Sequence, residues 1–181
     1  MAQTGVPFGE IPAVRDWIGI SGPVSKPEIE HPKRPIEGFE CTRSEVSGRR
    51  LWGLFADQFG TAEAFFKDHF VANYCPLVWM ADTGRNITPD KLPKNEIAPV
   101  ETACLKHLSQ IIEILDPDHL VGVGAYAKTK LEQVQKSNST RERKISSIIH
   151  PSPASPIANR DWPHRPVEQL IEAGILKQKT T

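Results

Sequence analysis

The chain has 181 residues, enough for one domain with a buried core. Hydrophobic residues make up 39% and charged residues 24% of the sequence, a composition typical of a folded globular protein. No stretch of about 18 apolar residues predicts a membrane span, and the formal net charge of +0 argues against bulk electrostatic attraction to nucleic acid.

The first 40 residues are rich in proline and glycine and predict loops, with one short helix around residues 11–19. Apolar residues recur at helical spacing over 44–59, where Ser44 is the expected N-cap. The apolar segment 70–75 (FVANYC) then predicts a short strand, which Pro76 ends.

The second half of the chain alternates helical and strand patterns. Residues 97–115 place apolar groups on one helical face. Segment 120–124 (LVGVG) predicts a buried strand, followed by a helix through Lys136. Segment 144–150 (KISSIIH) predicts a third strand, and residues 167–176 form the expected final helix.

This alternation predicts an α/β fold with a parallel sheet, in a single domain over residues 1–181. Three strands are few for so many helices, because most α/β sheets have more. The chain also opens directly into a loop. We therefore expect the domain to be incomplete at its N-terminus and to lack a first, central strand.

Cysteine spacing and charge distribution are weakly informative. The three cysteines lie too far apart for a disulfide framework or a zinc site, so buried free thiols are expected: Cys41, Cys75 and Cys104.

Residues 119–181 hold ten Lys and Arg against five Asp and Glu. Such a basic half could face phosphates, although an ordinary solvated surface explains it better.

Two polar side chains are expected just beyond the carboxyl ends of strands, where ligand groups gather in parallel sheets. Asn73 lies near the end of segment 70–75, and His150 closes segment 144–150 before Pro151 and Pro153. Either residue alone is more often structural, a turn asparagine or a hydrogen-bonded surface histidine. Because both residues are expected at corresponding strand ends, a binding site there and purely structural roles are about equally favoured.

The run from Gly122 to Ala127 fits the loose dinucleotide-binding pattern G-x-G-x-x-A, with Glu142 twenty residues after Gly122. This would indicate an NAD-dependent oxidoreductase. The acidic residue, however, should end the next strand, whereas Glu142 precedes it. Tight packing of a helix on a strand is the favoured explanation of the two glycines.

A set of segments in order along the chain carries a specific resemblance: MAQTGVPFG, EHPKRP, SEVSGRRLWG, NYCPL, GRNITP, LVGVG and IIHPSP. The chain resembles the single-strand-selective monofunctional uracil-DNA glycosylases of the uracil-DNA glycosylase superfamily. The resemblance covers the chain from its start to about residue 176. Any one of these segments is far less specific than the ordered set.

The resemblance implies a three-layer α/β/α fold around a short parallel sheet. It implies hydrolysis of the N-glycosidic bond of uracil, and of 5-substituted uracils such as 5-hydroxymethyluracil, in single- and double-stranded DNA. No cofactor or metal is implied. The expected setting is base-excision repair in the nucleus, by a monomer that leaves abasic sites to downstream enzymes and needs no membrane.

The resemblance also assigns roles to individual residues. Phe8 matches the aromatic residue that stacks on the flipped base, and Met1 is placed beside the same base. Asn73 matches the residue whose amide pairs with the uracil edge and discriminates against cytosine. His150 matches the catalytic histidine that stabilises negative charge on the departing base.

The loop after His150 matches the segment that enters the DNA duplex, and Pro151, Ser152 and Pro153 are expected DNA contacts. Ala154 stands where the family usually has an intercalating arginine, which predicts weaker extraction of bases from duplex DNA. Arg160 is the nearby cation that could compensate.

The family's water-positioning asparagine and its strand would precede Met1. Two hypotheses follow from this departure. In the first, the sequence is part of an active glycosylase. In the second, the chain is a catalytically impaired short form that acts only as a weak DNA- or partner-binding protein.

Overall fold

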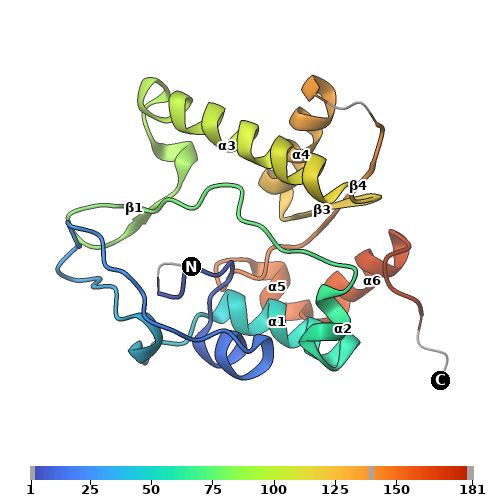
Figure 1. Cartoon of the computed structure of the whole chain (residues 1–181), viewed down its shortest axis with the longest axis horizontal. Coiled ribbons are helices and arrows are strands. Elements are labelled where there is room, and N and C mark those ends of the chain that lie inside the picture. Colours follow the sequence, from blue (N-terminus) through green and yellow to red (C-terminus); the bar gives the residue numbers. More distant parts are fainter. Residues whose placement is uncertain (1–2, 139–140, 179–181) are drawn as a thin grey trace. The chain divides into compact units, whose positions relative to one another are not determined.

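The computed structural model describes residues 3–138 and 141–178. The chain forms two compact units, Met1–Pro99 and Val100–Thr181, and each is described by itself below. Figure 1 labels the elements of both. The expectation of a single domain stays a prediction.

The first unit is built around aromatic side chains on short helices. They are η1 (Ala13–Ile18), α1 (Val46–Phe59) and α2 (Ala62–Phe66). Trp52 of α1 and Phe65 of α2 are each 2% exposed, and their rings pack edge to face with centroids 6.2 Å apart. Because these residues recur on one side of each helix, burying them fixes how α1 packs on α2.

The N-terminal arm is fastened to α1 through backbone and carboxylate contacts. The indole Nε1 of Trp52 donates a hydrogen bond to the Phe8 carbonyl at 3.0 Å. Glu10, which is buried, accepts hydrogen bonds from the backbone N–H of Ala13 at 3.1 Å and from the hydroxyl of Ser44 at 3.2 Å. Glu10 thereby satisfies an otherwise unpaired amide in the first turn of the helix at residues 11–18.

The expected N-cap at Ser44 is wrong. Helix α1 begins at Val46, and its N-cap residue Glu45 makes no capping hydrogen bond through its side chain. The Ser44 hydroxyl donates to Glu10 instead. The Ser44 hydroxyl therefore bonds to a residue distant in sequence instead of capping the helix, and the local sequence could not reveal this partner.

The expected strand at 70–75 is also wrong, because residues 69–78 run as an irregular segment. A strand persists only when its backbone groups pair with a neighbouring strand. A small hairpin that the sequence did not predict follows, in which β1 (Trp79–Met80) pairs antiparallel with β2 (Asn86–Ile87). Two 3₁₀ turns complete this unit, η2 (Gly38–Glu40) and η3 (Pro89–Lys91).

The second unit contains the predicted parallel strands. Helix α3 (Lys94–Leu115) begins in the first unit and leads to β3 (His119–Val123), α4 (Ala125–Asn138) and β4 (Lys144–Ile148). Strands β3 and β4 are parallel, with Val121 opposite Ser146. Helix α4 packs on both strands. The α/β fold class is thus confirmed.

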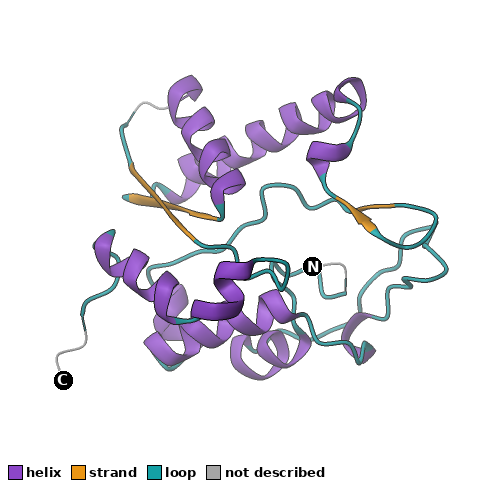
Figure 2. Ribbon diagram, turned by 180° about the vertical axis from the view of Figure 1, so that it is seen from behind, coloured by secondary structure: helices purple, strands orange, loops and turns teal. Residues whose placement is uncertain are grey.

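Two further helices, α5 (Pro156–Asp161) and α6 (His164–Glu172), end the described structure. Helix α6 packs against β4, and the side-chain carbonyl of Gln169 accepts a hydrogen bond from the backbone N–H of Ile149 at 2.9 Å. Figures 1 and 2 show α3 and α4 on one side of the strand pair and α5 and α6 on the other. The final helix was expected over 167–176; it begins and ends earlier, and Gly174 follows it at φ +76°.

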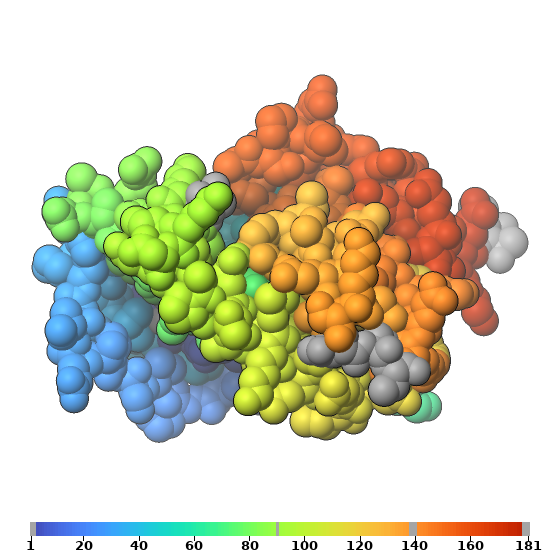
Figure 3. Space-filling view, turned by 90° about the horizontal axis from the view of Figure 1, so that it is seen from above, coloured from blue at the N-terminus to red at the C-terminus, as the bar shows by residue number. Residues whose placement is uncertain are grey.

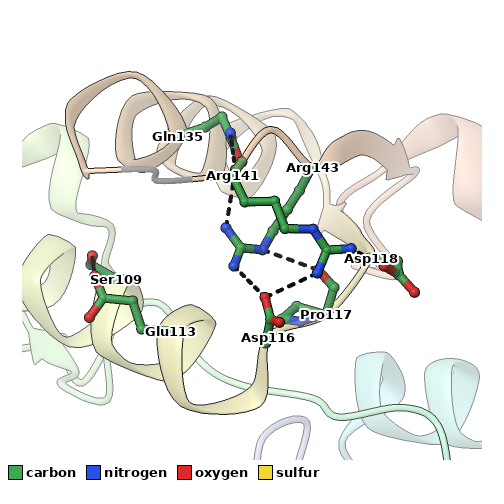
Figure 4. Close-up of polar contacts among 8 residues, drawn as sticks. All are labelled: Ser109, Glu113, Asp116, Pro117, Asp118, Gln135, Arg141 and Arg143. Carbon is green, nitrogen blue, oxygen red and sulfur yellow. Dashed lines mark hydrogen bonds and ion pairs between the residues drawn. The ribbon is translucent and has the colours of Figure 1, made fainter.

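The loops that enter β3 and β4 are tied together by charged side chains (Figure 4). Arg143, whose side chain is 6% exposed, donates to the Pro117 carbonyl at 3.1 Å and to the Asp116 carboxylate at 2.7 Å. Arg141 pairs with Asp116 at 3.2 Å and with Asp118. Because these loops lie at the amino ends of the strands, the network stabilises the edge of the sheet away from His150.

Two of the predicted buried thiols are confirmed. Cys41 and Cys104 are free and buried, whereas Cys75 is free but partly exposed. Within residues 3–138 and 141–178, none of the helices is long and apolar enough to cross a bilayer.

Candidate functional site

The carboxyl ends of β3 and β4 bring Gly124 and His150 together. Gly124 follows β3 directly, and its backbone N–H donates to the Ile148 carbonyl at 2.8 Å, which closes the ladder at this edge. His150 lies two residues beyond Ile148, the end of β4. The expectation that His150 stands at a strand tip in a parallel sheet is therefore confirmed.

The imidazole of His150 is held in one tautomer. The backbone N–H of Ser152 donates to its Nδ1 at 3.1 Å, so Nδ1 acts as an acceptor and the neutral ring carries its proton on Nε2. Partial burial lowers the pKa of His150, although the residue as a whole is exposed. At neutral pH the ring is consequently an uncharged donor through Nε2–H.

The loop after His150 is a compact turn held by its own polar groups. Pro151 is buried beneath it. The Ser152 hydroxyl accepts a hydrogen bond from the backbone N–H of Ala154 at 3.1 Å, and the Ser152 carbonyl accepts one from the N–H of Ser155 at 2.9 Å. The side-chain amide of Asn159 donates to the Pro153 carbonyl at 2.8 Å. The loop is thus shaped without needing a ligand.

Helix α5 begins directly after this loop. The Ser155 hydroxyl accepts from the backbone N–H of Ala158 at 3.3 Å and caps the helix. Pro153 and Ala154 are exposed at the tip of the loop, and Arg160 is exposed on α5. The structure therefore groups His150 with the residues expected to contact DNA, all within the second unit.

Phe8 and Asn73 belong to the first unit. Phe8 has φ +52°, which is uncommon for a residue with a side chain. Its ring is partly exposed while its carbonyl is held by Trp52. Asn73 is half-buried in the irregular segment 69–78, so its expected place at a strand end is wrong. Met1 lies outside the described residues.

Three residues that shape this site were not predicted as part of it: Gly124, Ser155 and Asn159. Gly124 had been interpreted either as part of a dinucleotide-binding pattern or, preferably, as a sign of tight packing of a helix on a strand. The structure supports the packing explanation, because a methyl group on Gly122 would lie 2.6 Å from Cα of Lys128 in α4. The local sequence around Ser155 and Asn159 does not indicate which backbone amide or carbonyl each side chain will bond.

Ion pairs involve part of the basic surplus of the second unit. Several of its cations are paired with carboxylates in the described structure: Lys128 with Glu132, Lys130 with Glu101, Arg141 with Asp116 and Asp118, Arg143 with Asp116, and Arg165 with Glu168. Five of the ten Lys and Arg of residues 119–181 thus have carboxylate partners in the described structure, and the expectation of an ordinary solvated surface stays a prediction.

Two other kinds of site were considered. Among the described residues, no three His, Cys, Asp or Glu side chains gather where they could hold a metal ion. A groove of about 450 Å³ lies between α3 and α4; Figure 3 views the molecule from the side of these two helices. Most of the residues that line it have polar side chains, but the surface they turn to the groove is mostly apolar, and none of the residues expected to act on a base belongs to it. The chemistry predicted from the sequence therefore does not lie in this groove.

The second unit thus presents a neutral imidazole donor at the carboxyl edge of a parallel sheet, beside a rigid exposed loop. Such a donor can stabilise an oxygen atom on which negative charge develops. The family model of the uracil DNA glycosylase superfamily matches residues 1–170. The chain belongs to the uracil DNA glycosylase superfamily.

Particular relatives match over nearly the whole chain. The single-strand selective monofunctional uracil DNA glycosylase of Bos taurus is 45% identical over 181 residues, which are 100% of this chain and 66% of the relative. The proteins of that name from Mus musculus and Rattus norvegicus are each 44% identical over 176 residues, 97% of this chain and 63% of the relative. The chain thus spans just under two thirds of the length of these curated relatives.

Proposed function

We propose that the protein is a monofunctional DNA glycosylase that hydrolyses the N-glycosidic bond of uracil in DNA. Membership of the superfamily supports the reaction class. The observation that carries the proposal in the structure is His150, a neutral Nε2–H donor fixed at the carboxyl end of β4 by the Ser152 amide.

His150 stabilises the leaving base. When the bond between C1′ and N1 breaks, its electron pair moves onto the base and gives uracil O2 negative charge. A donor already in place at that oxygen lowers the barrier, and removing such a donor reduces the rate by a factor of about 10²–10³. Water supplies the hydroxyl group that remains on C1′, so the products are free uracil and an abasic site.

Asn73 and Phe8 select the base. The asparagine amide can donate to uracil O4 and accept from N3–H, whereas cytosine presents the opposite pattern at these positions. Such a bidentate contact discriminates by about 1–3 kcal/mol. The ring of Phe8 stacks on the extruded pyrimidine, which contributes about 1–3 kcal/mol per base. Phe8 is partly exposed and its carbonyl is held by Trp52, so its ring is available for this contact.

The loop after His150 contacts the DNA. Pro151, Ser152, Pro153 and Ala154 form its described turn, and Arg160 follows on α5. The methyl group of Ala154 is a small wedge, so we expect unpaired uracil to be released faster than uracil in a duplex, where unstacking opposes extrusion. Oxidised 5-substituted uracils, such as 5-hydroxymethyluracil, are included in the proposed substrate range.

The biological setting follows from this reaction. We propose that the protein acts in the nucleus as a monomer, without a cofactor, and that abasic-site repair enzymes take over its product. The alternative is a protein that binds DNA or a partner without catalysis. The glycosylase proposal and this alternative are distinguished by whether the protein releases free uracil from DNA.

The test is single-turnover release of uracil from a single-stranded oligonucleotide. We expect His150→Leu to slow release by about 10²–10³-fold and Asn73→Ala to reduce release while weakening discrimination against cytosine. The controls are His107→Leu and Asn86→Ala, which alter exposed residues of α3 and β2 and should leave the rate unchanged. Rates of His150→Leu and Asn73→Ala equal to wild type would overturn the assigned roles, and DNA binding without any uracil release would establish the alternative.

A further inference from the structure

We propose that Gly124 is a positioning residue for His150: the space beside its α-carbon is occupied by the His150 side chain, chiefly its Cβ, and only glycine leaves that side chain where it is. The proposal rests on the proposed function for its catalytic consequence. Its structural part, that Gly124 and His150 share one space, stands on its own.

The contact between the two residues is close. A methyl group built on Gly124 would lie 3.1 Å from Cβ of His150, 3.4 Å from Cδ2 and 3.6 Å from Cγ. Carbon atoms in favourable contact are about 3.5–4.0 Å apart. A methyl group at position 124 would therefore press chiefly on Cβ of His150, whereas Cδ2 and Cγ would lie at ordinary contact distance. Because Cβ carries the ring, moving it also moves Nε2, the atom that donates.

Gly124 itself cannot move aside, because hydrogen bonds fix it on two sides. Its N–H donates to the Ile148 carbonyl at 2.8 Å, and its carbonyl accepts from the N–H of Lys128 at 3.2 Å. Helix α4 is pressed against β3, since even a methyl on Gly122 would come within 2.6 Å of Cα of Lys128. The start of α4 is therefore fixed, and the strain of an added methyl falls on His150.

When the His150 side chain is displaced, its hydrogen bond with the Ser152 backbone changes, and this has a chemical consequence. Its Nδ1 accepts the Ser152 N–H at 3.1 Å, and Pro151 between them is buried. Displacing the ring stretches this hydrogen bond, which is the contact that holds the proton on Nε2. The contact at 3.1 Å requires a shift of only a few tenths of an ångström. Since a displacement of about 1 Å of a reacting group can reduce a rate about 10²-fold, this smaller shift should slow the chemical step about tenfold and affect substrate binding less.

A glycine can also be required only for its backbone, and Gly124 has φ +90°. The chain offers a matched control for this explanation. Gly174 has φ +76°, and a methyl group there would meet nothing within 4 Å. Gly174→Ala therefore places the same residue in left-handed backbone without touching His150, and it separates backbone strain from pressure on the ring.

The experiment compares Gly124→Ala with Gly174→Ala in the same protein. For Gly124→Ala we expect the single-turnover rate of uracil release to fall at least about tenfold while the apparent substrate affinity changes less than about threefold. Long-range proton–nitrogen NMR of the His150 ring should show loss of the pure Nε2–H tautomer. Gly174→Ala should match wild type in rate, affinity and NMR. An unchanged ring spectrum in folded Gly124→Ala would overturn the proposal.

A double-mutant cycle keeps the proposal testable without activity. His150→Gly removes the three nearest atoms that the added methyl would meet, including Cβ, which makes the tight contact. The loss of stability caused by Gly124→Ala should therefore shrink in the His150→Gly background to that of Gly174→Ala. If Gly124→Ala unfolds the protein and the double variant refolds it, the proposal is supported. If both fail to fold, or the loss is the same in both backgrounds, backbone strain explains Gly124 and the proposal is wrong.

The outcomes distinguish this inference from the proposed function. A wild-type protein that releases no uracil would refute the glycosylase proposal. The tautomer spectrum and the stability cycle would still decide whether Gly124 positions His150.

Discussion

Substitution of Gly48 by alanine tests how α1 holds the N-terminal arm. A methyl group at position 48 would overlap the Phe8 carbonyl oxygen and lie 2.7 Å from Cβ and 3.0 Å from the backbone nitrogen of Glu10. Carbon contacts need about 3.5–4.0 Å, so the arm must retreat by about 1 Å. The same carbonyl accepts the Trp52 indole hydrogen bond at 3.0 Å, which the retreat would weaken.

The expected magnitude follows from three terms. Overpacking typically costs about 1–3 kcal/mol, and the weakened hydrogen bond costs about 1 kcal/mol. Alanine is better than glycine in a helix by about 1 kcal/mol, which offsets part of this. The net loss for Gly48→Ala is therefore about 1–3 kcal/mol. Gly53→Ala in the same helix, where a methyl meets nothing within 4 Å, should gain about 0.5–1 kcal/mol.

Urea unfolding followed by tryptophan fluorescence measures both changes, because Trp17 and Trp52 lie in this unit with ring centroids 6.1 Å apart. Gly48→Ala should unfold at lower urea concentration than wild type, and Gly53→Ala at higher. Because Phe8 moves with its carbonyl, Gly48→Ala should also release uracil more slowly. A Gly48→Ala protein as stable as Gly53→Ala would refute the close packing of the arm on α1.

Three further predictions concern the second unit. Burial lowers the pKa of both His119 and His150, and the neighbouring Lys144 lowers it further at His119. The unfolded state therefore binds more protons, so the stability of the protein should be full above about pH 6.5 and should fall as the pH drops below it. The fall should be smaller in His119→Asn than in wild type, and acid unfolding curves that coincide for the two proteins would contradict this. Arg143→Met should lower stability by about 1–3 kcal/mol in urea, because the Pro117 carbonyl loses a donor, and an equal effect of a surface arginine variant such as Arg160→Met would argue against it. Ser155→Ala should lower thermal stability by about 1 kcal/mol through loss of the α5 cap, whereas an unchanged melting temperature would show that the cap contributes nothing.

The sequence predicted the elements whose signals are local. The run 120–124 is apolar and bounded by glycine, and the structure forms β3 there. Helix α4 and strand β4 follow where alternating patterns placed them. His150 was found because its position after a strand is itself a sequence feature. Within this unit, local pattern and tertiary packing favour the same structure.

Prediction failed where structure depends on a distant partner. Residues 70–75 have the apolar character of a strand, yet they run as an irregular segment, because strand propensity cannot replace a pairing neighbour. The hairpin of β1 and β2 has only two residues per strand, too short for an alternation pattern. Ser44 was expected to cap α1 but bonds to Glu10, which is 34 residues away in sequence.

The candidate site shows the same division. Phe8, Asn73 and His150 were predicted as site residues because the sequence around them resembles a known family. The superfamily is confirmed by the match over residues 1–170. The supporting contacts were not predictable, because the tautomer of His150 depends on the Ser152 amide. The need for glycine at 124 depends on how close two strand ends come.

The account depends most on His150 stabilising negative charge on the departing base, and this is tested by changing the leaving group. Wild type and His150→Leu are compared on single-stranded DNA that carries either uracil or 5-fluorouracil, whose anion is intrinsically more stable. We predict that His150→Leu slows uracil release by about 10²–10³-fold but slows 5-fluorouracil release much less, since that base needs less help to leave. Equal losses for the two bases would contradict the account, because His150 would then act on something other than the leaving group.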